Sequence, residues 1–379
     1  MLSFVPVNFN NWYRILYDKF FKQLDFDLHY VNDIVPDPPY YYISDLNTSH
    51  QNSKNSVWFF DQEPLHPEAL RFVDSASKWY FSSGAKLLVT SEISETVDRY
   101  AQGMNATSIY YFFHAIAANE WYRNYRWDYP KYTGHKHTFI SYNNLVSPFR
   151  AHRIDLLCRL YDKDLVKQGL VSFNAPGDVQ LEKAIERNPW YTEESKFIFN
   201  KQKSNLSESL TIDTEKVEGF LSASIDLKNS RDCLVQVVTE TEFFKDKLHL
   251  TEKVFKPIVS GQPFLLLAGV GNLGYLKRYG FKTFNDYWDE GYDTITDPGK
   301  RVEAVVNIIE RISNMSYSEQ VSMRKDMQDI IEHNFRHLFT DLKPIVVDEF
   351  LKNTTAALDL HGIKYTANDI KQIYQLLVN

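Results

Sequence analysis

Apolar and polar positions in the first third of the chain follow a pattern that predicts strands alternating with helices. Three short apolar runs are typical of buried strands: residues 56–65, 85–92 and 108–115. Three segments have the periodicity or capping of helices: residues 12–24, 66–81 and 94–102. Strands that alternate with helices of about 10–15 residues indicate βαβ units and a parallel sheet.

The pattern is interrupted at residues 124–137, where polar residues, proline and glycine gather, and a second strand–helix series follows. The last part of the chain, from Pro298, is helical in pattern. We therefore predict an α/β protein with two Rossmann-like domains and a helical C-terminus. The predicted boundaries are 1–130 and 131–345, with C-terminal helices at 346–379.

Composition narrows the class of protein. The 379 residues are 44% hydrophobic, enough for two large cores, and no apolar stretch has the length of a membrane span. The net charge of −7 disfavours a general nucleic-acid binder, which needs many lysines and arginines. Only two cysteines occur, and the N-terminus does not resemble a signal peptide. We expect a soluble, cytoplasmic protein with no transmembrane segment.

Polar side chains follow the predicted strands of the first domain. Asp61 and Glu63 lie at the end of the first run, Glu92 at the end of the second and His114 at the end of the third, while His66 lies just beyond Glu63. Ligands of open α/β sheets bind outside the carboxyl ends of the strands. These residues are thus candidates for catalysis or for binding an acceptor. The alternative is that Asp61 and Glu63 only form a turn before a proline.

A second candidate site begins at the stretch "LTEKVFKPIVSGQPFLLLAG". Thr251 is a good helix N-cap, and Glu252 complements the positive end of a helix. Lys253 opposes that dipole, which is understandable if an anion binds there. Glu240 ends the apolar strand that precedes this stretch. The alternative is an ordinary capped helix.

Arginines gather at the start of another predicted helix. Arg150 and Arg153 are three residues apart, in a helix expected to begin near Ser147 or Pro148. The helix dipole disfavours arginines at this end, which points to a phosphate ligand rather than a solvated basic face.

The segment from Val235 to Gly269 resembles the donor-binding signature of α1,3-fucosyltransferases. Both have a strand ending in glutamate, a loop, Thr-Glu-Lys, a helix, and a small-residue and proline turn into an apolar strand. In that family the glutamate of Thr-Glu-Lys holds the ribose and the lysine the pyrophosphate. The resemblance therefore assigns these roles to Glu252 and Lys253, and places Glu240 near the donor.

Two further elements are similar to the same family. Residues 139–162 resemble its strand–Asn–loop–Arg–helix element, whose arginine grips the donor diphosphate. Arg150 and Arg153 both match, and Arg150 is preferred. The strand and turn "VWFFDQEPLHPE" resemble the element that supplies the catalytic base, which would be Glu63, with Asp61 as the second candidate.

The resemblance implies a GT-B glycosyltransferase, with two Rossmann-like domains facing each other across a cleft. It also implies that the C-terminal helices at 346–379 pack back on the first domain. It would invert the anomeric centre without a metal, using a nucleotide-sugar co-substrate, GDP- or UDP-linked, and no other cofactor. The donor would lie in the second domain. A glycan or other hydroxyl acceptor would lie in the first, near His66, Glu92 and His114.

Other functions remain open at this stage. A sugar transferase acting on modified DNA bases would need a basic face on residues 1–130, where the charges are mixed. A non-catalytic glycan-binding protein would have no reason for Lys253 beside two arginines. A nicotinamide enzyme is disfavoured, because no Gly-x-Gly-x-x-Gly follows an early strand, and "GVGNLG" at 269–274 fits a sugar-facing loop better. The Asp-x-Asp at Asp25–Asp27 lies in the wrong domain for a metal-dependent donor site.

Overall fold

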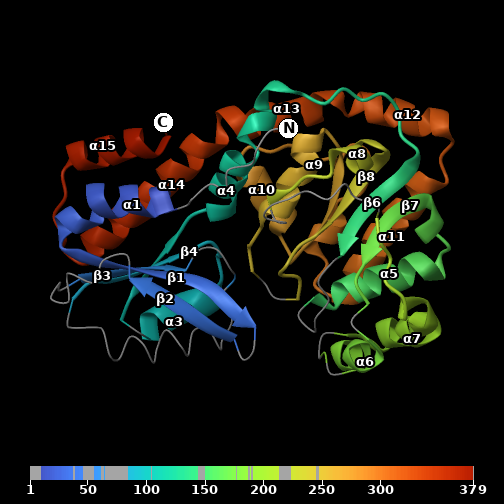
Figure 1. The fold of residues 1–379 in the computed structure, drawn as a ribbon, viewed down its shortest axis with the longest axis horizontal. Coiled ribbons are helices and arrows are strands. Elements are labelled where there is room, and N and C mark those ends of the chain that lie inside the picture. The colour runs from blue at the N-terminus through green and yellow to red at the C-terminus, as the bar shows by residue number, and fades with distance from the viewer. Residues whose placement is uncertain are drawn as a thin grey trace. The chain divides into compact units, whose positions relative to one another are not determined.

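The chain divides into two units, and the computed structural model describes most of both. The described residues are 10–36, 39–45, 55–60, 64, 84–103, 105–143, 150–175, 177–186, 188, 191–212, 223–244 and 247–378. Contacts between Cα atoms group residues 118–341 into one compact unit. The other unit combines residues 5–117 with residues 342–379. Each unit contains its own β-sheet (Figure 1).

The N-terminal unit is built on a five-stranded sheet with the order β2-β1-β3-β4-β5. Its strands are β1 (Phe26–Pro36), β2 (Pro39–Asp45), β3 (Asn55–Phe60), β4 (Lys86–Thr90) and β5 (Thr107–Tyr110). The pairs from β1 through β5 are parallel, whereas β2 is an antiparallel edge strand. Strands β3 and β4 are buried along almost their whole length, as expected for a parallel sheet covered on both faces.

Helices from both ends of the chain cover this sheet. They are α1 (Asn10–Lys19), η1 (Phe21–Leu24), α3 (Glu95–Gly103), α14 (Leu342–Leu360) and α15 (Ala367–Val378). Helix α14 packs on β5, where Asn353 donates a hydrogen bond of 2.8 Å to the carbonyl of Tyr110. The rings of Phe350 and Tyr111 also pack together, with their centroids 5.1 Å apart. Residues 342–379 therefore belong to the N-terminal unit.

Residues 118–341 surround a four-stranded parallel sheet with the order β7-β6-β8-β9. The strands are β6 (His137–Asn143), β7 (Gly169–Phe173), β8 (Cys233–Thr239) and β9 (Phe264–Leu267). Every residue of β8 and β9 is buried, which accounts for their largely apolar sequences. From β6 the chain first adds β7 on one side, then crosses back to add β8 and β9 on the other.

Helices and short 3₁₀ segments complete this unit. After α4 (Phe113–Trp121) and η2 (Arg123–Trp127) come α5 (His152–Asp162), η4 (Val166–Gln168), α6 (Asp178–Glu186), α7 (Glu193–Gln202), η5 (Lys203–Leu206) and α8 (Leu227–Arg231). The remainder are η7 (Glu252–Val254), α9 (Phe255–Ser260), α10 (Asn272–Arg278), η8 (Gly291–Thr294), α11 (Pro298–Ser313), α12 (Tyr317–Asp326) and α13 (Gln328–Thr340). Helix α11 packs on α5, β6 and β9, whereas α9 contacts α13 and α8 (Figure 1).

The prediction of an α/β fold with parallel sheets is confirmed, but individual elements differ from it. The run expected to be a strand at 108–115 stops at Tyr110, and the chain enters helix α4 at Phe113. Helix α5 begins at His152, later than the expected start near Ser147 or Pro148, so Arg150 precedes the helix. An apolar run of this length does not distinguish a strand from a buried helix start, which explains the first error.

Candidate functional site

The candidate site lies where β6 and β8 end side by side in the sheet. The chain leaves β6 toward β7 and leaves β8 toward β9, which lie on opposite sides of this pair. Such a reversal of strand order opens the space at the carboxyl ends, where open α/β sheets bind ligands. The segment after β6 carries Arg150 and Arg153, and the segment after β8 carries Glu240, Glu252 and Lys253.

Glu240 is the buried centre of this site. It directly follows β8 and its side chain is fully buried. One carboxylate oxygen accepts a hydrogen bond of 3.2 Å from the backbone N–H of Thr251, and the other accepts one of 2.6 Å from the Thr251 hydroxyl. Burial raises the pKa of Glu240, while Lys253 and the bonds from Thr251 oppose this shift. Glu240 thus fixes the turn that presents Thr-Glu-Lys.

Lys253 is held in place but not enclosed. Its Nζ donates to the Thr251 hydroxyl at 3.0 Å and the Thr241 hydroxyl at 3.3 Å, and lies 3.4 Å from Glu252. The Lys253 side chain remains 30% exposed, whereas Glu252 is only 8% exposed. An ammonium that is oriented by neutral hydroxyls and still faces solvent is well suited to meet an anion.

Arg153 joins the two segments. It lies in the first turn of α5, is 4% exposed, and donates from Nη2 to the Thr239 carbonyl at 3.1 Å. Burial, together with Arg150, lowers the pKa of Arg153 to about 10, while Glu240 and Glu252 raise it. The guanidinium therefore stays charged at neutral pH and lies within the field of both carboxylates.

His152 packs beside this arginine as a neutral side chain. Its Nε2–H donates to the Glu240 carbonyl at 3.1 Å. Its ring stacks on that of Phe243, with the ring centroids 4.5 Å apart. Burial lowers the pKa of His152 far below its ordinary value, and Arg153 and Arg150 add to this effect. The histidine positions the backbone after β8 without adding charge.

Lys256 is the residue of this site that the sequence analysis missed. It lies in α9, and the charges of Glu252, Lys253 and Glu240 act on it. Its position in the sequence could have revealed it. Lys256 lies three residues after Lys253 and four after Glu252, so on a helix it shares a face with both. We call Arg150, Arg153, Lys253 and Lys256 the cation cluster. With Glu240 and Glu252 as the neighbouring carboxylates, four cations face two anions.

All five residues predicted to bind the donor thus belong to one site. Arg150 is partly buried and interacts electrostatically with Arg153 and His152. Because Arg153 is almost enclosed and bonded to a strand carbonyl, Arg150 is the more accessible of the two arginines. The preference for Arg150 as the phosphate ligand is consistent with this difference in exposure and stays a prediction.

The structure describes only some of the residues predicted to act in the first domain as catalytic base or acceptor ligands. Asp61, Glu63 and His66 lie outside the described residues. Glu92 follows β4, is 1% exposed, and accepts a hydrogen bond of 2.7 Å from Ser94, whose hydroxyl caps α3 by accepting from the N–H of Val97. His114 is 6% exposed in the first turn of α4. Their acceptor-binding role stays a prediction.

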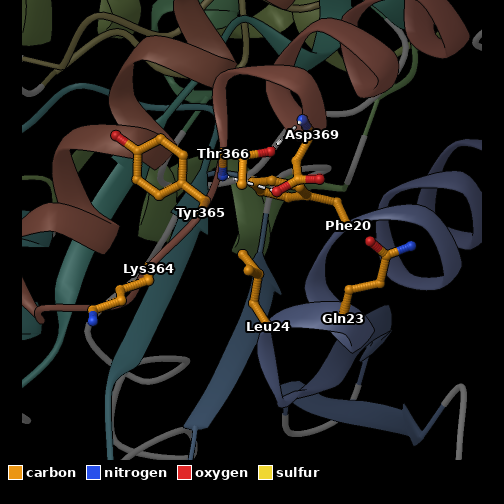
Figure 2. Close-up of a pocket in the computed structure, with 7 residues that line it drawn as sticks. All are labelled: Phe20, Gln23, Leu24, Lys364, Tyr365, Thr366 and Asp369. Atoms are coloured by element: carbon orange, nitrogen blue, oxygen red, sulfur yellow. Dashed lines mark hydrogen bonds between the residues drawn. The ribbon is translucent and has the colours of Figure 1, made fainter.

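A pocket also occurs on the surface of the N-terminal unit, and Figure 2 shows its lining. It lies between η1 and the start of α15 and is lined by Phe20, Gln23, Leu24, Lys364, Tyr365, Thr366 and Asp369. Thr366 and Asp369 bond to each other's backbone N–H groups, at 3.2 and 2.8 Å, as a helix cap. The side chains of Thr366 and Asp369 are therefore accounted for by the cap of α15.

Comparisons with known proteins leave the site to be judged on its own geometry. No protein-family model matches the chain, and neither a search of curated proteins nor one of solved structures found a match. Among the described residues, no three His, Cys, Asp or Glu side chains are grouped so as to hold a metal ion. None of the helices in the described ranges combines the length and hydrophobicity of a membrane span.

Proposed function

We propose that this protein is a glycosyltransferase that moves a sugar from a nucleoside-diphosphate sugar to an acceptor hydroxyl. The observation that carries the proposal is the cation cluster at the ends of β6 and β8, where four cations interact with Glu240 and Glu252 among the described residues. An excess of positive charge, built from two separate chain segments, suits a ligand with several negative charges. A diphosphate is such a ligand.

The same charges explain how the transfer would proceed. As the acceptor oxygen attacks the anomeric carbon, the bond from that carbon to the diphosphate breaks, and negative charge grows on the departing nucleoside diphosphate. Lys253 and the arginines would stabilise that charge electrostatically, which is the task of a metal ion in other transferases. Glu252, next to Lys253, is placed to hold the ribose, as the family resemblance implies.

The acceptor proton must pass to a base. We propose that Glu63, or else Asp61, takes it, since the resemblance places them at the end of a strand in the N-terminal unit. Two units, each with its own largely parallel sheet, support a GT-B arrangement with the donor in residues 118–341. The sugar is fucose in the family resembled, and GDP or UDP is the expected nucleotide.

The test is a thermal-shift and calorimetric titration of the full chain with GDP, UDP, CMP and TDP. One nucleoside diphosphate should stabilise the wild-type protein, by about 2.7 kcal/mol at a concentration of a hundred times Kd. Lys253→Ala should lose this stabilisation, whereas Glu63→Ala should keep it. Lys277→Ala, which removes a lysine paired with Glu290 at 3.0 Å, controls for a general loss of charge.

The outcomes separate the functions. A nucleotide that binds wild type and Lys277→Ala but not Lys253→Ala supports the donor site. Transfer of the sugar from the corresponding nucleoside-diphosphate sugar to an acceptor, by wild type but not by Glu63→Ala, supports catalysis. If no nucleotide binds the wild-type protein, the proposal is wrong. Glycan binding without nucleotide binding would then favour a non-catalytic glycan-binding protein.

A further inference from the structure

Lys256 differs from the other lysines near the candidate site in having no partner of its own. Its side chain is partly buried in α9, yet no hydrogen bond or ion pair joins its Nζ to another residue in the parts of the chain described here. Lys253, three residues earlier, has three oxygen partners. Lys277, on the next helix, is paired with Glu290 at 3.0 Å.

The charges around Lys256 do not supply the missing partner. Both oxygens of Glu240 accept bonds from Thr251, and an oxygen of Glu252 lies 3.4 Å from Lys253. Lys253 itself repels a second ammonium. An ammonium withdrawn from water costs free energy unless an anion or several acceptors compensate it. Lys256 is partly buried and its Nζ is not among the fully buried polar atoms that lack a partner, so its ammonium bears part of this cost, and an external anion would offset it.

We infer that Lys256 is a further phosphate-binding residue of this site, and that its ammonium pairs with the diphosphate also held by Lys253 and the arginines. The identity of the ligand rests on the proposed function. The inference adds a residue from α9, so that the diphosphate would meet cations from the segments after both β6 and β8. It also predicts that affinity depends on pH in a range where arginines do not titrate.

The direction of the pH dependence follows from the surroundings of Lys256. Burial lowers the pKa of Lys256 to about 8, with Lys253 acting in the same direction and Glu252 and Glu240 opposing it. Tyr122, near Glu252, has its own pKa raised far above its ordinary value by burial, so it adds no charge here. Only the ammonium form pairs with phosphate, so affinity is greatest below about pH 8 and falls above it.

The experiment measures binding of inorganic pyrophosphate, GDP and UDP to the full chain by calorimetry at pH 7 and pH 9. The proteins are wild type, Lys256→Met, Lys256→Arg and the control Lys277→Met. We expect Lys256→Met to bind about tenfold more weakly than wild type at pH 7, and wild type to lose about five- to tenfold in affinity at pH 9. Lys256→Arg stays charged and should lose much less. Titration of the ligands themselves is common to all four proteins and cancels.

The possible failures are distinguishable. If a nucleotide binds wild type and Lys256→Met equally at both pH values, Lys256 is not a phosphate ligand, and the proposed function is unaffected. If pyrophosphate binding depends on Lys256 but no nucleotide binds, the anion site stands and the donor assignment fails. Equal losses of affinity in Lys256→Met and Lys277→Met would also overturn the inference, because they would reflect net charge alone.

Discussion

The junctions that follow β8 and β9, two neighbouring strands of the same sheet, differ in their balance of positive and negative charge. After β9, the carboxylate of Asp293 accepts hydrogen bonds from the N–H groups of Leu273 and Gly274, at 2.9 and 3.0 Å, at the start of α10. After β8, the cation cluster interacts with two carboxylates in the described part of the chain, and one of these, Glu240, is turned inward onto Thr251. At the junction after β9, Asp293 of the chain itself is the anion, whereas the junction after β8 has an excess of positive charge.

The contrast shows why a glycine-rich sequence is a weak guide to a ligand site. The "GVGNLG" stretch was expected to face a sugar, yet two of its N–H groups are already bonded to Asp293. Burial raises the pKa of Asp293, and these two bonds oppose that shift. The Thr-Glu-Lys stretch has no glycine, and its significance comes from the charges around it. The balance of charge, rather than the backbone motif, separates the two junctions.

Removing the buried carboxylate after β8 should have the largest effect on stability. In Glu240→Ala, the N–H and hydroxyl of Thr251 lose their acceptor and three neighbouring cations lose a buried anion, so we expect the free energy of unfolding to fall by about 2–4 kcal/mol. Urea denaturation followed by circular dichroism measures this change. Glu240→Gln keeps one acceptor and should lose less. Equal stability of Glu240→Ala and wild type would mean that Glu240 does not hold the turn.

A pair of variants tests the contrast between the junctions directly. Asp293→Ala should lower the free energy of unfolding by about 1–2 kcal/mol, because two N–H groups of α10 lose their acceptor. Its affinity for the nucleoside diphosphate should stay unchanged. Lys253→Ala should do the reverse, with a stability change below about 1 kcal/mol and an affinity about 10- to 100-fold lower. Calorimetric titration and urea denaturation of both proteins give the four values.

The distinction between the junctions fails if both variants lose affinity to the same extent. It also fails if Asp293→Ala alone loses affinity, since the start of α10 would then be the ligand site. Because the two residues have no hydrogen-bond partner in common, their effects on stability should add in the double variant.

Much of the fold could be predicted because its strands are buried on both faces. The sequence of β9 is a continuous apolar run and that of β8 is apolar apart from Gln236 and Thr239, which is typical of strands in a covered parallel sheet. The β1–β2 hairpin was missed, since its strands mix charged, polar and aromatic residues. Helices α6 and α7 were missed for a similar reason: they lie in a polar region whose amphipathic pattern is weak.

The site was predicted in part, through residues whose local sequence made them unusual. Lys253 stood out because it follows an N-cap and a glutamate, and the five predicted donor residues do come together. Lys256 did not stand out, because a lysine within a helix is ordinary in sequence. Its lack of a partner depends on how Glu240 and Glu252 are engaged, which is decided by the fold and not by the residues next to it.

The last expected effect concerns the stability cost of the positive charge after β8. Because the pKa of Lys256 is lowered to about 8 in the folded protein, the unfolded chain binds this proton more tightly. The ammonium therefore destabilises the wild-type fold fully below pH 8, and this cost is relieved as the pH rises from about 8 toward the ordinary lysine value of 10.5. Lys256→Met, which lacks the charge, should be more stable than wild type at pH 7.

Urea denaturation of wild type, Lys256→Met and Lys256→Arg at pH 7, 8, 9 and 10 measures this cost. The difference between wild type and Lys256→Met should shrink as the pH rises, while Lys256→Arg should stay less stable than Lys256→Met throughout. A difference that does not change with pH would mean that the surroundings do not disfavour the ammonium. Saturating pyrophosphate should reverse the order at pH 7, because the anion stabilises the charge that destabilises the empty site.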